Sequence, residues 1–215
     1  GFVNQYAGPL LGLPAARPYS KGEGVLVSVI DTGVDSSHPV LMGQVSPLGI
    51  NLVYSLQEPN DSSNGIDDDG DTLVDELWGH GTFIAGLIHL VAPKARILPV
   101  TVLNDDGVGD TSTIAAGIVY SADNGAHVIS LALGTEVRSL VVAAAIDYAV
   151  GKGITIISPV GNDGGPESLY PAAEGNVHGV GGSDHLDTYG WYSNINEAIR
   201  YCAPGSSTLG GGNPV

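Results

Sequence analysis

Residues 25–35 read Val-Leu-Val-Ser-Val-Ile-Asp-Thr-Gly-Val-Asp, and this stretch decides which fold we expect. Its first six residues, Val25–Ile30, form a mostly β-branched run that follows a glycine. Such a run is typical of a strand that is buried on both faces of a sheet. Asp31 follows directly, where a carboxylate is costly unless a partner compensates for its desolvation. Taken alone, Asp31 is more typical of a helix cap or a turn than of a functional site.

Outward from this stretch, apolar runs alternate with helical patterns. We predict strands over Arg96–Leu103, His127–Leu133 and Ile154–Ser158, and helices over Phe83–Leu90, Thr111–Asn124 and Ser139–Lys152. Single helices between strands imply parallel pairing through right-handed crossovers. The expected fold class is α/β, a three-layer α/β/α domain with a central parallel sheet, and residues 1–215 form one domain. Residues 43–77 are a polar, acidic insertion, and residues 164–215 are rich in Gly, Pro and Asn with no clear helix.

Composition excludes some classes of partner. The 215 residues carry a net charge of −16, from 23 acidic and 7 basic residues. A surface of this charge repels phosphate backbones and anionic lipids, so we expect no nucleic-acid or membrane partner. Cys202 is the one cysteine, so the chain has no internal disulfide. The acidic surface and scarce lysine favour a secreted or otherwise extracytoplasmic protein.

Two further polar residues stand at the ends of predicted elements. His80 lies between two glycines where a helix begins, and Asn162 follows the predicted strand Ile154–Ser158. In parallel α/β sheets, sites form at the carboxyl ends of the strands, which is where Asp31 and Asn162 lie. Each residue also has a plain structural interpretation, a surface histidine or a turn asparagine. Their order along one sheet is more informative than any of them alone.

Three motifs together resemble a known family. Residues 29–35 (VIDTGVD), residues 79–88 (GHGTFIAGLI) and Gly161-Asn162 closely resemble the upstream signatures of subtilisin-like serine peptidases, the subtilases. The resemblance implies a subtilisin-like fold and an Asp-His-Ser triad. It makes His80 the general base, Asp31 the residue that fixes the histidine tautomer, and Asn162 the amide that stabilises the oxyanion.

The resemblance also implies that polypeptide substrates bind between two extended segments. One segment is Gly107-Val108-Gly109, and the opposing one is Leu131-Ala132-Leu133-Gly134, with Gly161 in the pocket wall. Tyr170-Pro171 matches the place where the family has a cis proline. A propeptide is a further possible partner.

The family's nucleophile motif, Gly-Thr-Ser followed by small residues, does not occur in this sequence. Ala203-Pro204-Gly205 resembles the landmark that shortly precedes it, and Ser206 and Ser207 are poor candidates because a glycine-rich run follows them. We expect a serine endopeptidase acting through an acyl-enzyme, whose serine lies on a C-terminal fragment or second chain, so that these residues alone are inactive. The alternative is a catalytically dead relative that binds peptides or serves as a scaffold.

The acidic insertion contains a partial calcium-loop pattern. With Gly70 as the invariant glycine, Asp67, Asp69 and Glu76 fall on ligand positions and Asp71 offers a further oxygen. Closely spaced carboxylates repel one another unless a cation is present. We therefore predict a structural calcium ion at Asp67, Asp69, Asp71 and Glu76, and the alternative is a solvated acidic loop. We expect no organic cofactor.

Overall fold

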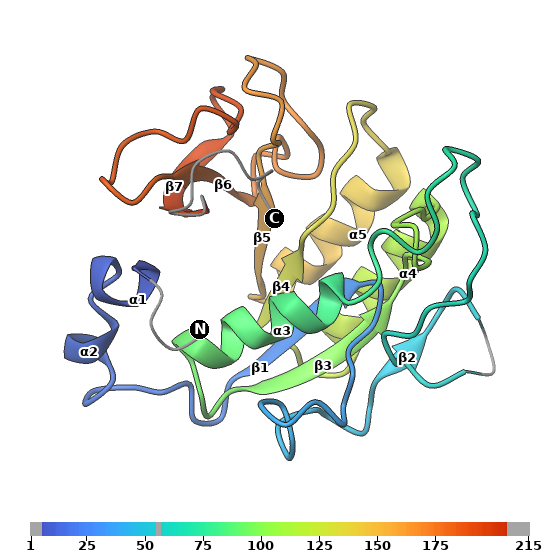
Figure 1. Cartoon of the computed structure of the whole chain (residues 1–215), viewed down its shortest axis with the longest axis horizontal. Coiled ribbons are helices and arrows are strands. Elements are labelled where there is room, and N and C mark those ends of the chain that lie inside the picture. The colour runs from blue at the N-terminus through green and yellow to red at the C-terminus, as the bar shows by residue number, and fades with distance from the viewer. Residues whose placement is uncertain (1–5, 55–56, 206–215) are drawn as a thin grey trace.

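The computed structural model describes residues 6–54 and 57–205, and Figure 1 shows a central sheet with helices on both sides. Two short helices open the chain, α1 (Ala7–Leu10) and α2 (Leu13–Ala16). The remaining elements are, in order, β1 (Leu26–Asp31), β2 (Ile50–Asn51), α3 (His80–Val91), β3 (Arg96–Thr101), α4 (Thr111–Asp123), β4 (Val128–Leu131), α5 (Leu140–Gly151), β5 (Thr155–Pro159), β6 (His178–Ser183) and β7 (Ile199–Pro204).

The strands form one parallel sheet in the order β2-β3-β1-β4-β5-β6-β7. β1 pairs with β3 on one side and with β4 on the other, in registers that place Asp31 opposite Thr101 and Ile30 opposite Leu131. After β1 the chain adds β2 and β3 on one side of this strand, and from β4 onward it adds the remaining strands on the other side. Such a switch point opens a crevice at the carboxyl ends of the strands, and Asp31 stands there.

Alternation of side chains along the strands produces two cores, one on each face of the sheet. Ile30 of β1 belongs to the larger core, together with Ile118 of α4 and Ile146 of α5. Val29, its neighbour in sequence, belongs to the smaller core with Ala85 of α3. α3 thus covers one face while α4 and α5 cover the other, which confirms the predicted three layers (Figure 1).

Two of the three strands that were not predicted, β6 and β7, lie in the glycine-rich region. Glycine is normally unfavourable in a strand, but in β6 it permits close packing. A Cβ atom on Gly179 would lie 2.2 Å from the carbonyl oxygen of Ala198, and one on Gly182 would lie 2.3 Å from the hydroxyl of Tyr192. The glycines that hid this strand in the sequence are therefore what lets its neighbours approach it.

The other predicted strands and helices are confirmed with small shifts at their ends, and α1, α2 and β2 were not predicted. Among the described residues, no helix is long and apolar enough to cross a membrane. The acidic insertion is an irregular loop around β2, and it connects β1 to α3.

Candidate active site

Asp31 and His80 meet at the carboxyl end of β1. Asp31 is the last residue of β1 and is fully buried, while His80 is the first residue of α3. The Nδ1 atom of His80 lies 2.7 Å from Oδ1 of Asp31. This is the separation of a charge-assisted hydrogen bond. Two residues that are 49 positions apart in sequence therefore form a dyad.

Glycine residues allow α3 to come this close to β1. A Cβ atom on Gly81 would lie 2.1 Å from the carbonyl oxygen of Gly33 and 3.1 Å from the Cβ atom of Asp31. Gly33 itself has a φ of 130°, and a Cβ atom there would lie 2.6 Å from the carbonyl oxygen of Asn60. The glycines around His80 thus have a physical cause, because a larger residue would push the first turn of the helix away from Asp31.

The environment of His80 favours its protonated form. Burial of the ring opposes protonation, but the hydrogen bond that the ring donates to Asp31 and the negative charges of Asp31 and Asp61 outweigh it. Together they raise the pKa of His80 above its ordinary value of 6.5. The side chain remains 20% exposed, so the ring is reachable from solvent while its Nδ1 atom is held by Asp31.

Asn162 lies on the loop that follows β5, and a second loop braces it. The backbone amide of Asp163 donates to Oδ1 of Asn194 at 2.9 Å, and the amide of Asn194 donates to the carbonyl oxygen of Gly161 at 3.0 Å. Asn194 is fully buried, and a Cβ atom on Gly161 would lie 2.4 Å from its Nδ2 atom. Asn162 itself is exposed, between residues that are fixed on both sides.

One groove of 620 Å³ joins these groups. His80 and Asn162 both line it, and so do Leu131, Ala132 and Gly161. Ile84 and Ile88 of α3 form one wall, and residues of β4, β5, β6 and β7 contribute to the others. The structure thus brings the predicted base, the predicted oxyanion amide and part of the predicted substrate strand to one cavity on the α3 face of the sheet.

Comparison with known proteins decides the family. The model of the Subtilase family matches residues 22–213, a range that contains Asp31, His80 and Asn162. The chain belongs to the subtilase family. The resemblance inferred from the three sequence motifs is confirmed, and so is the expected fold.

Named relatives of this subtilase are peptidases of greater length. Thermitase from Thermoactinomyces vulgaris is 34% identical over 212 residues, which cover 94% of this chain and 70% of thermitase. A cell wall-associated protease of Bacillus subtilis (strain 168) is 38% identical over 192 residues, covering 84% of this chain and 20% of that protein. The crystal structure of a lanthipeptide protease superposes with a TM-score of 0.80 at 26% identity, covering 94% of this chain and 62% of that one. The subtilase sequence in hand thus spans only part of each relative.

The predicted nucleophile candidates cannot be placed against this site. Ser206 and Ser207 lie outside the described residues, which end at Gly205. Gly205 itself lines the groove beside Ala203 and Pro204, so the landmark that resembles the approach to the family's serine does reach the cavity.

The remaining predicted substrate residues lie at the edges of the site. Leu133 is half-buried beyond the end of β4, and Gly134 is exposed next to Leu169. Val108 is 48% exposed just beyond the turn that follows β3, between Gly107 and Gly109. Gly107 packs on Leu77, and a Cβ atom on Gly107 would lie 2.9 Å from Cδ2 of Leu77. None of these residues lines the groove, and their contact with a peptide stays a prediction. The predicted Tyr170-Pro171 cis bond is present.

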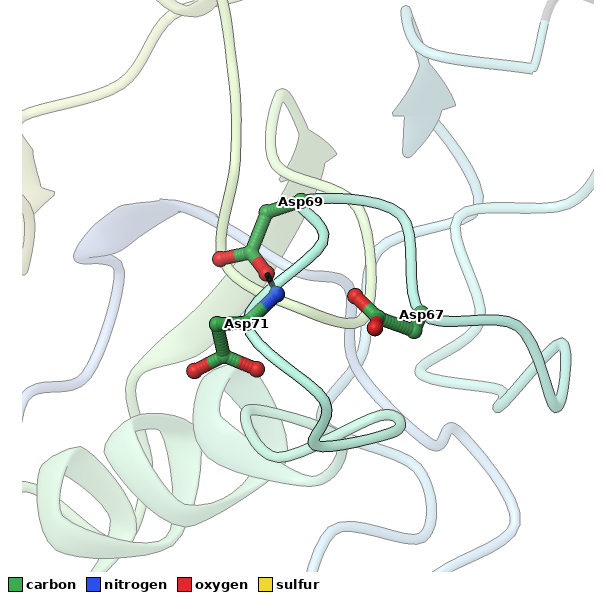
Figure 2. A group of neighbouring side chains, drawn as sticks. All are labelled: Asp67, Asp69 and Asp71. Carbon is green, nitrogen blue, oxygen red and sulfur yellow. Dashed lines mark hydrogen bonds between the residues drawn. The ribbon is translucent and has the colours of Figure 1, made fainter.

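Three of the four predicted metal ligands converge. Asp67, Asp69 and Asp71 each offer a carboxylate oxygen, and these oxygens all lie within 4.8 Å of one another (Figure 2). Gly70 has a φ of 83°, as the tight turn of a calcium loop requires. Glu76, however, lies outside this group, and the backbone between Asp71 and Glu76 contains two residues with left-handed angles, Thr72 and Asp75. The three converging aspartates suit a hard cation, with one protein ligand fewer than the four predicted.

Sequence reasoning missed Asp61 and Asn194, two buried residues that hold the site. Asp61 is 9% exposed and accepts hydrogen bonds from residues on both sides of the dyad, while Asn194 braces the Asn162 loop. Both lie in polar, loop-like stretches whose composition indicates solvent exposure. Nothing local in the sequence distinguishes them from the many exposed Asp and Asn residues of this subtilase.

Proposed function

We propose that this chain supplies the acid–base half of a serine endopeptidase that cleaves peptide bonds through an acyl-enzyme. The observation that carries the proposal is the 2.7 Å hydrogen bond between Asp31 and His80, at the mouth of a groove that Asn162 also lines. Asp31 holds the proton on Nδ1, which leaves Nε2 of His80 free to accept the proton of an attacking serine. The negative charge of Asp31 then stabilises the imidazolium that forms.

Asn162 would act on the opposite charge in the same step. When serine attacks a peptide carbonyl, negative charge develops on the carbonyl oxygen, and a preorganised amide donor stabilises it by about 3–4 kcal/mol. The bracing of its loop by Asn194 supports this role, because a donor that is already fixed loses little entropy when the oxyanion forms.

The serine would come from a segment outside the described residues. Apolar side chains from α3 and from the sheet line most of the groove, including Ile84, Ile88 and Ile157. A further segment packed there would bury this surface and bring a serine close to His80. A C-terminal fragment, a second chain or a continuation of the same polypeptide would each meet this requirement.

The substrate would be a polypeptide held in extended conformation. Leu131 and Ala132 already border the groove at the end of β4, and the exposed turn at Gly107-Val108-Gly109 would provide the opposing backbone groups. Leu133, Gly134 and Gly161 would complete the wall around the side chain that precedes the cleaved bond.

We also propose that the acidic insertion binds calcium through Asp67, Asp69 and Asp71. Converging carboxylate oxygens are the ligands that calcium prefers, and the ion would neutralise their mutual repulsion. An extracytoplasmic location, where calcium is abundant, fits this proposal, and one relative is named as a cell wall-associated protease.

A labelling experiment tests the peptidase proposal. Protein from the native source is treated with a fluorophosphonate probe, separated under denaturing conditions and identified by intact mass. We expect the probe on a polypeptide that carries a Gly-Thr-Ser motif, and we expect His80→Ala to abolish labelling while His89→Ala leaves it intact. Absence of label and of peptide cleavage in folded protein, with peptide binding retained, would contradict the proposal and favour the non-catalytic alternative.

A further inference from the structure

Asp61 occupies an unusual position for a residue of the acidic insertion. It is 9% exposed, and its carboxylate accepts four hydrogen bonds from three residues. Oδ1 accepts from the Thr32 hydroxyl at 3.1 Å and from the Gly79 amide at 3.0 Å, while Oδ2 accepts from the Thr82 amide at 3.0 Å and the Thr82 hydroxyl at 2.6 Å. Buried carboxylates that are this well satisfied are strongly anchored, because any movement breaks several charge-assisted bonds at once.

The donors to Asp61 flank both members of the dyad. Thr32 is the neighbour of Asp31 in sequence, whereas Gly79 and Thr82 lie on either side of His80. The Thr32 hydroxyl also accepts from the amide of Gly81 at 3.1 Å, which closes the link between the two segments. One carboxylate therefore connects the end of β1 to the first turn of α3.

The start of α3 depends on this distant acid. Its N-cap residue is Gly79, which has no side chain to satisfy the free amides of the first turn. Asp61 accepts from two amides of that turn and places a negative charge at the positive end of the helix dipole. A residue 19 positions before His80 thus replaces the missing cap.

The backbone around Asp61 is fixed as well. The indole Nε1 of Trp78 donates to the carbonyl oxygen of Asp61 at 3.0 Å. The amide of Val34 donates to the carbonyl oxygen of Pro59 at 2.9 Å. The absent side chain of Gly33 leaves space that Asn60 fills. Asp61 is therefore clamped from both sides of the insertion, and no rearrangement of its side chain alone would preserve its four bonds.

We propose that Asp61 is a positioning residue that locks the first turn of α3 against the end of β1 and so keeps the His80 ring on Asp31. The geometric part of this inference stands on the dyad alone, and its catalytic consequence rests on the proposed peptidase function. Asp61 touches neither the reacting atoms nor the ring of His80 through a hydrogen bond; it acts through the backbone and hydroxyl groups that surround them.

Charge supports the same role. Two carboxylates act on His80, Asp31 from β1 and Asp61 from the insertion, and both raise its pKa against the opposing effect of burial. Removal of the Asp61 charge should therefore lower the pKa of His80, in addition to loosening its attachment.

The test uses the chain as it stands and needs no peptidase activity. Nuclear magnetic resonance follows the His80 ring through a pH titration and records the Nδ1–H proton, which resonates far downfield when it is bound to a carboxylate. In Asp61→Asn we expect the pKa of His80 to fall and the downfield signal to broaden or vanish, because the variant loses one of the negative charges that raise this pKa. Asp187→Asn, which removes an exposed acid at a left-handed position that asparagine tolerates, should change neither.

A second pair of variants covers the case in which Asp61→Asn does not fold. Thr82→Val removes the hydroxyl that donates to Asp61, and Thr82→Ser keeps it. We expect the downfield signal to weaken in the valine variant and to persist in the serine variant. The inference is overturned if Asp61→Asn folds and His80 keeps its wild-type pKa and downfield signal. If Asp61→Asn does not fold, the inference is overturned by a Thr82→Val protein whose downfield signal equals that of wild type.

A kinetic measurement separates this inference from the peptidase proposal. In the longer, serine-bearing protein, Asp61→Asn should lower kcat by about tenfold to a hundredfold with little change in KM, as expected for a misplaced base. If wild type has no peptidase activity, the proposed function fails while the titration result still stands. If wild type is active and Asp61→Asn matches it in kcat and in its pH profile, positioning by Asp61 is refuted and the peptidase proposal survives.

Discussion

Replacement of Asp31 by asparagine should reverse the direction in which the pKa of His80 is shifted. In the wild-type chain, burial lowers this pKa, while the hydrogen bond that His80 donates to Asp31 and the charges of Asp31 and Asp61 raise it, with a net rise above 6.5. Asparagine keeps the shape of the side chain and removes its charge. Burial then has only the weaker effect of Asp61 to oppose it, so the pKa of His80 should fall below 6.5.

The size of the change follows from the contact distance. Nδ1 of His80 lies 2.7 Å from Oδ1 of Asp31, and Asp31 is fully buried. An opposite charge this close shifts a pKa by about 1–3 units, equivalent to about 1–4 kcal/mol between the two protonation states. We therefore expect a decrease of at least about one unit, larger than the change expected for Asp61→Asn.

The assay is a nuclear magnetic resonance titration of the histidine ring protons in the wild-type and variant chains. His89 provides an internal control, because burial and the charge of Arg17 lower its pKa and neither changes in the variant. An unchanged or higher pKa for His80 in a folded Asp31→Asn protein would refute the reasoning. It would mean that the close contact does not govern the protonation of the ring.

Other consequences can be measured separately. In the serine-bearing protein, Asn162→Ala should lower kcat about 10²–10³-fold with KM nearly unchanged, and an equal loss in KM would instead indicate a binding role. Since the pKa of His80 is raised on folding, protonated His80 stabilises the fold fully below pH 6.5, and this stabilisation is lost as the pH rises through the folded pKa. Urea unfolding of wild type and His80→Gln at several pH values should therefore show a difference in the free energy of unfolding that shrinks as the pH rises. Gly81→Ala should destabilise the fold by about 1–3 kcal/mol because its Cβ atom would meet a carbonyl oxygen at 2.1 Å, whereas Gly151→Ala, with nothing within 4 Å, should not. Chelation should lower the melting temperature and added calcium should restore it, while Asp69→Asn should abolish this response; a melting temperature indifferent to calcium would eliminate the metal proposal.

Sequence reasoning succeeded where chemistry and periodicity coincide. The run Val25–Ile30 predicted a buried strand because mostly apolar, β-branched runs are typical of strands that helices cover on both faces. The glycines beside His80 marked a helix start that has to approach another segment closely. In both cases the signal lies within a few neighbouring residues.

It failed where the determining contact lies far along the chain. Nothing near Asp61 in the sequence reveals that its carboxylate is buried under a helix that begins 19 residues later. The strand β6 was missed because its glycines are required by Ala198 and Tyr192, residues that follow it. Glu76 was expected from its spacing to join the aspartate group, but spacing does not specify the backbone path after Asp71, where Thr72 and Asp75 take left-handed angles.

The most direct test of the account is the crystal structure of the serine-bearing protein after reaction with a peptidyl fluorophosphonate. We predict a serine Oγ bonded to phosphorus, with Nε2 of His80 within about 3.2 Å of that oxygen and the Asn162 amide within about 3.1 Å of a phosphoryl oxygen. A covalent adduct formed elsewhere, or a bound serine that His80 does not reach, would contradict the assignment of Asp31 and His80 as the acid–base half of a peptidase.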